Sequence, residues 1–200
     1  MTPVAIVGTG AVGIAIAASL RRGDVDAVLV SRDPRSTTVS DIPVVSFDDL
    51  AADTDTFIIA VPGPAVEELL ATRGSRLAGH LLIDATNKVG AASYSQLPLF
   101  EQYTPTARVA RAWCTLGWEN FLDPEIDGVA LDLAWCGPDG VDGNHITSLI
   151  AATGLRPVRV GDLSKDHILE YVTRLTLSLI FETGRSRKLG IKILEGPNFS

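Results

Sequence analysis

Three glycines near the start of the chain have the spacing of a phosphate-binding turn. Gly8, Gly10 and Gly13 follow the apolar run Val4–Val7 and open an Ala-rich segment. A strand that ends in Gly-x-Gly-x-x-Gly and leads into a helix presents backbone N–H groups and a positive helix end to a pyrophosphate. Such turns also pack a helix against a strand without a ligand, but here a second apolar run, Ala27–Val30, follows where a βαβ unit needs one. We therefore predict a dinucleotide site.

The residues after the second apolar run select the nucleotide. Sites for NAD usually place Asp or Glu there to hold the ribose 2′-hydroxyl, whereas this chain has Ser31 followed by Arg32 and Arg35. A guanidinium is a planar donor well suited to a 2′-phosphate, which favours NADPH. In the alternative interpretation, Arg32 and Arg35 are solvated loop charges and Asp33 binds the ribose.

Strand and helix patterns alternate along the whole chain and predict the elements that position these residues. Apolar runs predict strands over 4–7, 27–30, 44–45, 56–61, 80–86, 108–113, 129–136 and 156–160, and helical spacing predicts helices over 14–20, 48–52, 65–77, 145–152 and 165–182. This order predicts an α/β fold with a doubly wound, mostly parallel sheet of the Rossmann type. We expect a dinucleotide-binding domain over 1–137 and a small strand–helix extension over 138–200, packed on the same sheet in one compact domain.

Ligands of doubly wound sheets lie beyond the carboxyl ends of the strands. Val61 and Pro62 follow one predicted strand with little side-chain bulk, and Asn87 follows the next, where it could hydrogen-bond a nicotinamide or a substrate. Each segment has a plainer interpretation, since Pro-Gly and Asn are also common in turns without a ligand. Lys88 is the nearest candidate proton donor, and we interpret all three histidines as surface or capping residues.

Composition narrows the class of protein. The chain has 200 residues, is 46% hydrophobic and carries a net charge of −7, which argues against nucleic acid as a partner. No apolar run approaches the roughly 20 residues that span a bilayer, and no basic segment precedes the first strand, so we expect a cytoplasmic protein without a membrane partner. Cys114 and Cys136 are too few for a disulfide framework or a zinc site, so we predict buried thiols and no metal.

Several motifs occur in the order found in NADPH-dependent coenzyme F420 reductases, and the chain resembles that family over nearly its whole length. They are Gly8-Thr9-Gly10-Ala11-Val12-Gly13, Ser31-Arg32, Ile83-Asp84-Ala85-Thr86-Asn87, Arg111-Ala112-Trp113-Cys114-Thr115-Leu116-Gly117, Cys136-Gly137-Pro138-Asp139 and Leu189-Gly190-Ile191-Lys192-Ile193-Leu194. The resemblance implies an NADP(H)-dependent oxidoreductase that passes hydride between the nicotinamide and the deazaflavin coenzyme F420 stacked over it. It also implies a homodimer whose other partners are small-molecule cofactors.

The resemblance assigns roles to individual residues. It makes Thr9, Ala11, Val12, Ser31, Arg32 and Arg35 nucleotide contacts and places Val61 and Asn87 near the nicotinamide. Leu116 falls where the family keeps an apolar side chain against the deazaflavin, and the tail 189–194 would close the pocket. Cys114 stands where several members carry His or Asn, and a thiol is the poorer hydrogen-bond donor. The acceptor could therefore be another flavin, a quinone, an imine or a ketone, and a sensor that binds NADPH without turnover is a further alternative.

A deazaflavin of this family carries an anionic tail, and two groups of cations are candidates to hold it. Arg185, Arg187, Lys188 and Lys192 lie near the end of the chain, and Arg108 and Arg111 lie in one predicted strand. The first group could equally be solvated charge beyond a helix end. Hydride transfer between two rings needs close positioning and exclusion of water, so no catalytic acid or base follows from the residues, and Asn87, Cys114 and Leu116 are positioning candidates.

Overall fold

A six-stranded parallel sheet forms the centre of the computed structural model, which describes residues 2–37, 39 and 41–196. Its strands are β1 (Val4–Val7), β2 (Ala27–Val30), β3 (Val44–Val45), β4 (Thr56–Ile59), β5 (Leu81–Asp84) and β6 (Arg108–Arg111). Their order in the sheet is β3-β2-β1-β4-β5-β6, and every neighbouring pair is parallel. The order reverses between β1 and β4, as in doubly wound dinucleotide-binding folds. The predicted fold class is confirmed.

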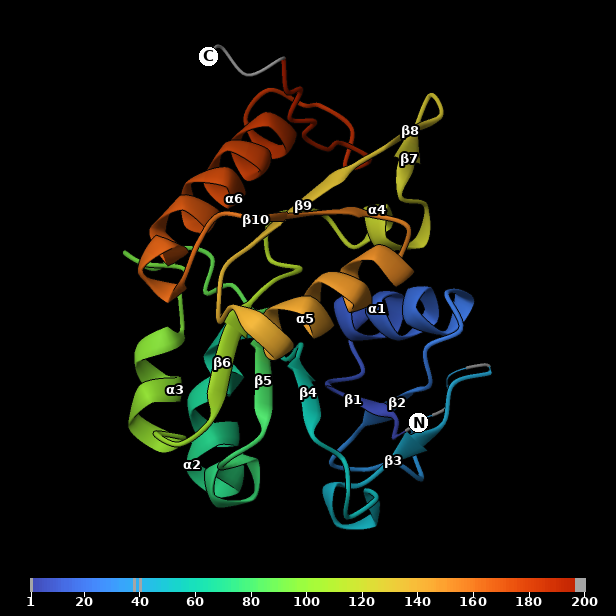
Figure 1. Cartoon of the computed structure of the whole chain (residues 1–200), viewed down its shortest axis with the longest axis vertical. Helices are drawn as coiled ribbons and strands as arrows, with labels where there is room; N and C mark the ends of the chain where they lie inside the picture. The colour runs from blue at the N-terminus through green and yellow to red at the C-terminus, as the bar shows by residue number, and fades with distance from the viewer. Residues whose placement is uncertain (1, 38, 40, 197–200) are drawn as a thin grey trace.

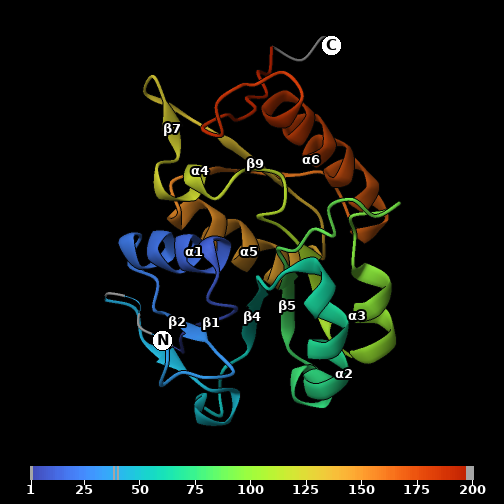
Figure 2. The same ribbon diagram turned by 180° about the vertical axis from the view of Figure 1, so that it is seen from behind.

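Helices cover both faces of this sheet (Figures 1 and 2). They are α1 (Ala11–Arg22) and α5 (Gly140–Ala152) on one face and α2 (Val66–Leu77) and α3 (Leu97–Tyr103) on the other. Helices α4 (Glu119–Leu122) and α6 (Asp166–Phe181) lie beside the strands that follow β6, and the short 3-10 turns are η1 (Phe47–Asp49), η2 (Gly63–Ala65) and η3 (Leu163–Lys165). One apolar core lies between the sheet and the α1 and α5 face, and a second lies between the sheet and the α2 and α3 face. Burial on both faces explains why β1, β4 and β5 are continuous apolar runs.

The extension after β6 builds a separate layer above the carboxyl ends of the main strands (Figure 1). Its strands are β7 (Glu125–Ile126), β8 (Val129–Ala130), β9 (Asp132–Trp135) and β10 (Arg156–Arg159). Instead of continuing the main sheet, β9 and β10 pair in a parallel two-stranded sheet, and β7 and β8 form a hairpin. An antiparallel bridge between Arg111 and Cys136 links β9 to β6. These strands therefore do not extend the main sheet, and the β9–β10 pair crosses the expected boundary at residue 137.

Several element bounds differ from the predicted ones for local reasons. The strand expected over 129–136 divides into β8 and β9, and the helix expected over 48–52 is the 3-10 turn η1, which Ser46 caps. Helix α5 begins at Gly140, five residues before the predicted start, because the Asp139 side chain accepts a hydrogen bond from the Gly140 N–H. Short elements with weak apolar spacing, α3, α4 and β7, were not predicted.

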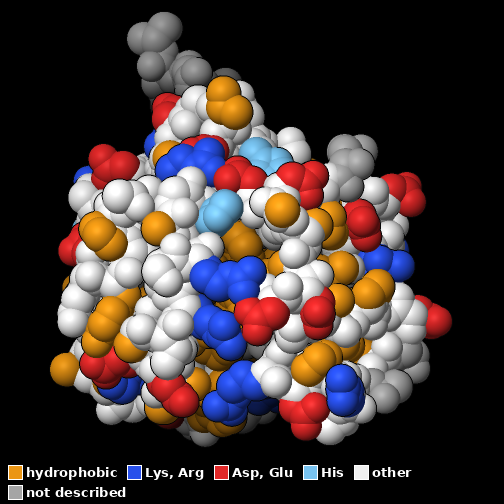
Figure 3. Space-filling model, turned by 90° about the horizontal axis from the view of Figure 1, so that it is seen from below, with side chains coloured by type: hydrophobic (Ala, Val, Ile, Leu, Met, Phe, Trp, Pro, Cys, Tyr) orange, Lys and Arg blue, Asp and Glu red, His pale blue; other side chains and the backbone are white. Residues whose placement is uncertain are grey.

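The described helices include none that is long and apolar enough to cross a bilayer. The side of the molecule on which β4, β5 and β6 begin is charged, with basic and acidic side chains intermingled and histidine among them (Figure 3). There Arg108 forms ion pairs with Asp55 and Asp142, and Arg73 and Arg76 both pair with Asp48. The opposite side, where these strands end, faces the extension.

Candidate functional site

The three glycines of the turn between β1 and α1 have different surroundings. Gly8 has φ +124°, and a Cβ there would lie 2.6 Å from the Ala60 carbonyl oxygen. A Cβ on Gly13 would overlap the Gly8 carbonyl oxygen and touch the Ile6 side chain. A Cβ on Gly10 would meet nothing within 4 Å. Gly8 and Gly13 therefore allow tight packing of strand, helix and the neighbouring loop, whereas Gly10 faces open space.

Helix α1 begins beside this open space with unused hydrogen-bond donors. Its N-cap is Gly10, which has no side chain to cap it, and the first helical bond runs from the Ile14 N–H to the Gly10 carbonyl. The N–H groups of Ala11, Val12 and Gly13 consequently have no acceptor within the helix. These three donors lie at the positive end of a helix, beside the open space at Gly10. Together they form a cradle that fits a pyrophosphate.

The turn after β2 carries Ser31, Arg32 and Arg35, which the sequence predicts to bind the 2′-phosphate, and its backbone is held by hydrogen bonds. Ser31 Oγ accepts a hydrogen bond from the Asp33 N–H at 3.1 Å and lies 3.3 Å from Thr37 Oγ1. Asp33 Oδ1 accepts the Ser36 N–H at 3.3 Å, so one carboxylate oxygen stabilises the turn. The side chain of Arg32 is 92% exposed, 3.9 Å from Glu68 at the start of α2. This exposed guanidinium can turn toward a ligand phosphate at little cost.

The loops after β4 and β5 touch each other at the carboxyl edge of the sheet. A Cβ on Gly63 would lie 2.7 Å from the Asn87 carbonyl oxygen, so the two loops pack backbone against backbone. Val61 is half-buried, Pro62 is exposed, and Asn87 is half-buried beside them. The structure thus brings Val61, Pro62 and Asn87 together next to the Gly8 turn, which contacts Ala60.

A buried polar network lies directly behind Asn87, and local sequence patterns do not predict it. Arg111, at the end of β6, is fully buried and donates to Asp166, to Asn87 Oδ1 at 2.8 Å and to the Thr86 carbonyl at 3.3 Å. Its Nε lies 3.8 Å from Asp84 Oδ2. Burial raises the pKa of Asp84, opposed by the charge of Arg111 and hydrogen bonds from Thr86. Burial lowers the pKa of Arg111, but the nearby acidic groups outweigh it, so this guanidinium stays protonated.

Cys114 and Leu116, predicted to lie near the second ring, are interior residues. Cys114 is 3% exposed and packs with Cys136 and Leu169, and Leu116 is 9% exposed and belongs to the core on the α1 face. Burial raises the pKa of Cys114 to about 11 and that of Cys136 to about 12. Both thiols are buried and free, as predicted. The proposed positioning roles of Cys114 and Leu116 remain predictions.

The histidines lie away from the glycine turn. His80 precedes β5 and contacts Asp55, and His145 contacts Thr56 at the start of β4, both at the amino ends of the strands. His167 contacts the Ser164 carbonyl near the start of α6. Lys88 is exposed and directly follows Asn87. In the loop after β5, Lys88 is therefore the exposed ionisable side chain next to Asn87.

The two candidate cation groups do not form the arrangement expected of them. Arg108 and Arg111 occupy opposite ends of β6, one in surface ion pairs and the other in the interior, so they cannot hold one anion together. Arg187 pairs with Glu119, Lys188 lies 2.8 Å from Asp123, and Lys192 lies 3.1 Å from Asp132. These cations neutralise carboxylates of the chain itself.

The tail after α6 follows β9. The Asp132 N–H donates to the Ile191 carbonyl, and the Ile193 N–H donates to Asp132 Oδ2 at 2.6 Å. Gly190 allows close packing because a Cβ there would lie 2.6 Å from the Leu131 side chain. The tail lies at the far end of the molecule from β1 (Figures 1 and 2), and its predicted role as a lid is not seen in this arrangement.

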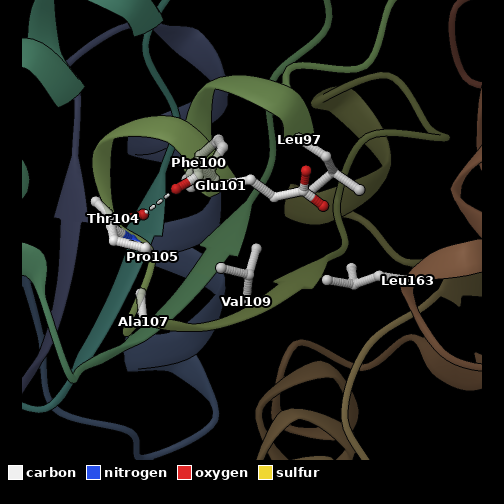
Figure 4. Close-up of a pocket in the computed structure, with 8 residues that line it drawn as sticks. All are labelled: Leu97, Phe100, Glu101, Thr104, Pro105, Ala107, Val109 and Leu163. Atoms are coloured by element: carbon white, nitrogen blue, oxygen red, sulfur yellow. Dashed lines mark hydrogen bonds between the residues drawn. The ribbon is translucent and has the colours of Figure 1, made fainter.

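A small hollow lies elsewhere, at the outer edge of the sheet (Figure 4). It has a volume of about 210 Å³ and is enclosed by α3, β6 and η3, with Leu97, Phe100, Val109 and Leu163 in its wall. None of its lining residues belongs to the glycine turn or to the loops after β4 and β5. This hollow is therefore separate from the candidate nucleotide site.

Comparisons with known proteins agree with the geometry. Residues 3–88, from β1 to the loop after β5, match the family model described as "NADP oxidoreductase coenzyme F420-dependent". No curated protein matches the chain. The match supports the resemblance stated above over residues 3–88, which hold the glycine turn and the turn after β2, and the chain is similar there to NADP-dependent oxidoreductases.

Solved structures share the fold. A candidate F420-dependent NADP-reductase from Arthrobacter sp. FB24 is 20% identical, with a TM-score of 0.78 over 98% of this chain and 100% of that one. A hypothetical protein from Sinorhizobium meliloti is 27% identical, with a TM-score of 0.68 over 82% of this chain and 87% of that one. Pyrroline carboxylate reductase from Plasmodium falciparum with NADP bound is 15% identical, with a TM-score of 0.61 over 94% and 72%.

Proposed function

We propose that this protein transfers hydride between NADP(H) and a deazaflavin of the coenzyme F420 type. The observation that carries the proposal is that three features lie at the carboxyl edge of the sheet. They are the free N–H groups at the start of α1, the Ser31-Arg32 turn after β2, and the loops after β4 and β5, where Val61, Pro62 and Asn87 meet and no histidine lies among them. Residues 3–88 match a family described by NADP and coenzyme F420 together, which supports the pairing of these two substrates.

The residues of the turn after β2 would select NADPH over NADH. Ser31 offers a hydroxyl where a carboxylate would repel a 2′-phosphate, and the exposed Arg32 supplies a charged donor. Arg35 is exposed in the same turn and adds a second positive charge. The N–H groups at the start of α1 would hold the pyrophosphate between the two halves of the coenzyme.

Hydride transfer requires the protein to position the two rings and does not require a catalytic acid or base. When bound, NADPH would supply the hydride to a ring carbon of the deazaflavin, and the ring would take up the balancing proton from solvent. Rings held roughly 3–3.5 Å apart and shielded from water need no catalytic base. The side chains at the loop edge fit this requirement, because Val61 and Pro62 are small and apolar and Asn87 is neutral.

A second candidate function keeps the coenzyme and changes the acceptor to an imine, ketone, flavin or quinone. Reduction of an imine or ketone needs a proton donor, and Lys88 is exposed directly after Asn87. That function predicts a rate that depends on pH and falls strongly in Lys88→Met. Ring-to-ring transfer predicts little effect of the same substitution. A sensor without turnover predicts NADPH binding with no oxidation by any acceptor.

We also propose that a second copy of the chain covers α6. Ile168, Tyr171 and Leu175 share one face of this helix by spacing and are 36%, 67% and 52% exposed. Light scattering of the purified protein should give the mass of a dimer, and Leu175→Glu should give that of a monomer. A wild-type monomer at micromolar concentration would contradict this proposal.

The deciding experiment mixes the purified protein with NADPH and oxidised deazaflavin and follows both absorbances. We expect them to fall together in a one-to-one ratio. Arg32→Ala should raise the KM for NADPH roughly tenfold or more, the value of one charge-assisted hydrogen bond. The matched control Arg73→Ala, which removes an exposed arginine of α2 paired with Asp48, should leave that KM unchanged. Binding of NADPH without loss of either absorbance would refute the proposed reaction.

A further inference from the structure

The side chain of Asn87 is held in one orientation by its protein neighbours. Its Oδ1 accepts from Arg111 at 2.8 Å, and its Nδ2 donates to the Cys114 carbonyl at 2.8 Å. A guanidinium can only donate and a carbonyl can only accept, so the two ends of the carboxamide cannot exchange places. One N–H and one oxygen lone pair of Asn87 remain for a ligand.

Several elements fix the two groups that hold Asn87. Arg111 is anchored by Asp166 at the start of α6 and by the Thr86 carbonyl after β5. The Cys114 carbonyl also accepts from Thr173 Oγ1 of α6 at 3.1 Å. The orientation of the Asn87 carboxamide is thus set jointly by β5, β6 and α6.

The buried network lowers the stability of the fold, which indicates that it serves a function. Arg111 Nε and Asp84 Oδ2 are buried, lie 3.8 Å apart and have no hydrogen-bond partner among the described residues. Buried polar atoms without partners destabilise a fold, whereas an apolar side chain at position 111 would avoid that cost. A buried charge that orients a partly exposed amide gives a reason for this choice of residue.

Asn87 stands where the reactive half of a dinucleotide would lie. In doubly wound sheets the first three strands bind one nucleotide and the second three bind the other, across the point where the order reverses. Asn87 follows β5 in the second half and packs against the Gly63 loop after β4. The adenosine half belongs to the turn after β2, so the nicotinamide half falls to the Asn87 side.

We propose that Arg111 is a positioning residue that fixes the Asn87 carboxamide to bind the carboxamide of the nicotinamide ring. The proposal rests on the proposed function, because it requires NADPH in this site. The remaining N–H and lone pair of Asn87 complement those of a second primary amide. Arg111 itself is fully buried and acts through Asn87.

The test compares two ligands, NADPH and 2′-phospho-ADP-ribose, which lacks the nicotinamide. Arg111→Lys and Asn87→Ala should each weaken NADPH binding about five- to tenfold, the value of one hydrogen bond in a site. Binding of the fragment should change less than about twofold, since it makes no contact with Asn87. Lysine keeps the buried charge but has no planar fork to hold the amide.

The double variant Arg111→Lys, Asn87→Ala provides the second readout. If Arg111 acts through Asn87, the double variant should bind NADPH no more weakly than Asn87→Ala alone. The matched control is Arg156→Lys, because Arg156 also pairs with a buried carboxylate, Asp132, at 2.6 Å. It should change the affinity for neither ligand, and thermal unfolding of every variant records any loss of fold.

The outcomes separate this inference from the proposed function. Equal weakening of both ligands, no weakening of either, or additive losses in the double variant would overturn the role of Arg111 while NADPH binding by the wild type stands. If Arg111→Lys does not fold, selective weakening by Asn87→Ala supports the contact and equal binding overturns it. A wild-type protein that binds no NADPH would overturn the proposed function and this inference together.

Discussion

Gly10 and Gly13 stand in one motif, but the structure predicts opposite consequences when each is replaced by alanine. At Gly10 the backbone has φ −79° and ψ 176°, which any residue adopts, and a Cβ would meet nothing within 4 Å. Gly10→Ala should therefore fold, with a loss of about 1 kcal/mol or less from its N-cap position. The new methyl group would occupy the open space in front of the first N–H groups of α1.

The expected loss falls on the ligand. Each hydrogen bond from a backbone N–H to a pyrophosphate is charge-assisted and contributes about 1.5–3 kcal/mol, so displacing the phosphate from one of them weakens binding roughly ten- to hundredfold. Titration of the protein with NADPH, followed by the fluorescence of the reduced nicotinamide, measures this loss. The melting temperature of Gly10→Ala should stay close to that of the wild type.

Gly13→Ala is the matched comparison, because its methyl group would overlap the Gly8 carbonyl oxygen. Such overpacking costs about 1–3 kcal/mol, which lowers the melting temperature of a chain of this size by roughly 3–10 °C. The reasoning fails if Gly10→Ala binds NADPH as tightly as the wild type. It also fails if the two variants lose stability equally, since the packing argument would then not distinguish them.

Three further predictions follow from individual contacts. Ser31→Asp should shift preference from NADPH toward NADH by roughly tenfold or more, because a carboxylate repels the 2′-phosphate and can hold the ribose hydroxyl instead; titration with both coenzymes measures it, and an unchanged ratio would contradict the role of this turn. Hydrogen bonds from Arg156, Ile193 and Lys192 outweigh burial and lower the pKa of Asp132 from 3.8 to about 2. A carboxylate with a depressed folded-state pKa stabilises the fold above its unfolded pKa, so the stability difference between wild type and Asp132→Asn should be full at neutral pH and shrink as the pH falls from about 4 to about 2; a difference that does not change across this window of pH-dependent melting curves would be evidence against the contact. Cys114 and Cys136 should react with a thiol reagent at neutral pH only as fast as the protein opens, because burial raises their pKa values to about 11 and about 12; rapid labelling of the folded protein would show that they are accessible.

Local patterns predicted the nucleotide-binding half because its determinants are close together in the sequence. The glycine spacing, the run Ala27–Val30 and the Ser31-Arg32 pair all lie within one βαβ unit, in which the structure shows the predicted strand, helix and strand. The element order then predicted a doubly wound sheet, since each strand is followed by a connection that returns to the same edge.

Long-range pairing decided what the sequence could not predict. The residues next to Arg111 in the sequence do not distinguish it from a surface arginine. Its burial depends on Asp166, which lies 55 residues later, and on Asn87. The separate β9–β10 sheet depends on register between segments that are each compatible with the main sheet. The burial of Cys114 is likewise long-range, since Leu169 of α6 packs against it and Thr173 of α6 donates a hydrogen bond to its carbonyl.

The distribution of charge reconciles an acidic chain with a ligand that carries several phosphates. Most described arginines and lysines outside the turn after β2 are paired with carboxylates, including Arg108, Arg111, Arg187 and Lys192. Arg32 makes only a loose pair, since its side chain is 92% exposed and lies 3.9 Å from Glu68. A net charge of −7 repels anions at long range, but salt screens that repulsion beyond about 8–10 Å. At contact distance a ligand phosphate would meet the guanidinium and the N–H groups at the start of α1, which favour an anion although the chain as a whole is acidic.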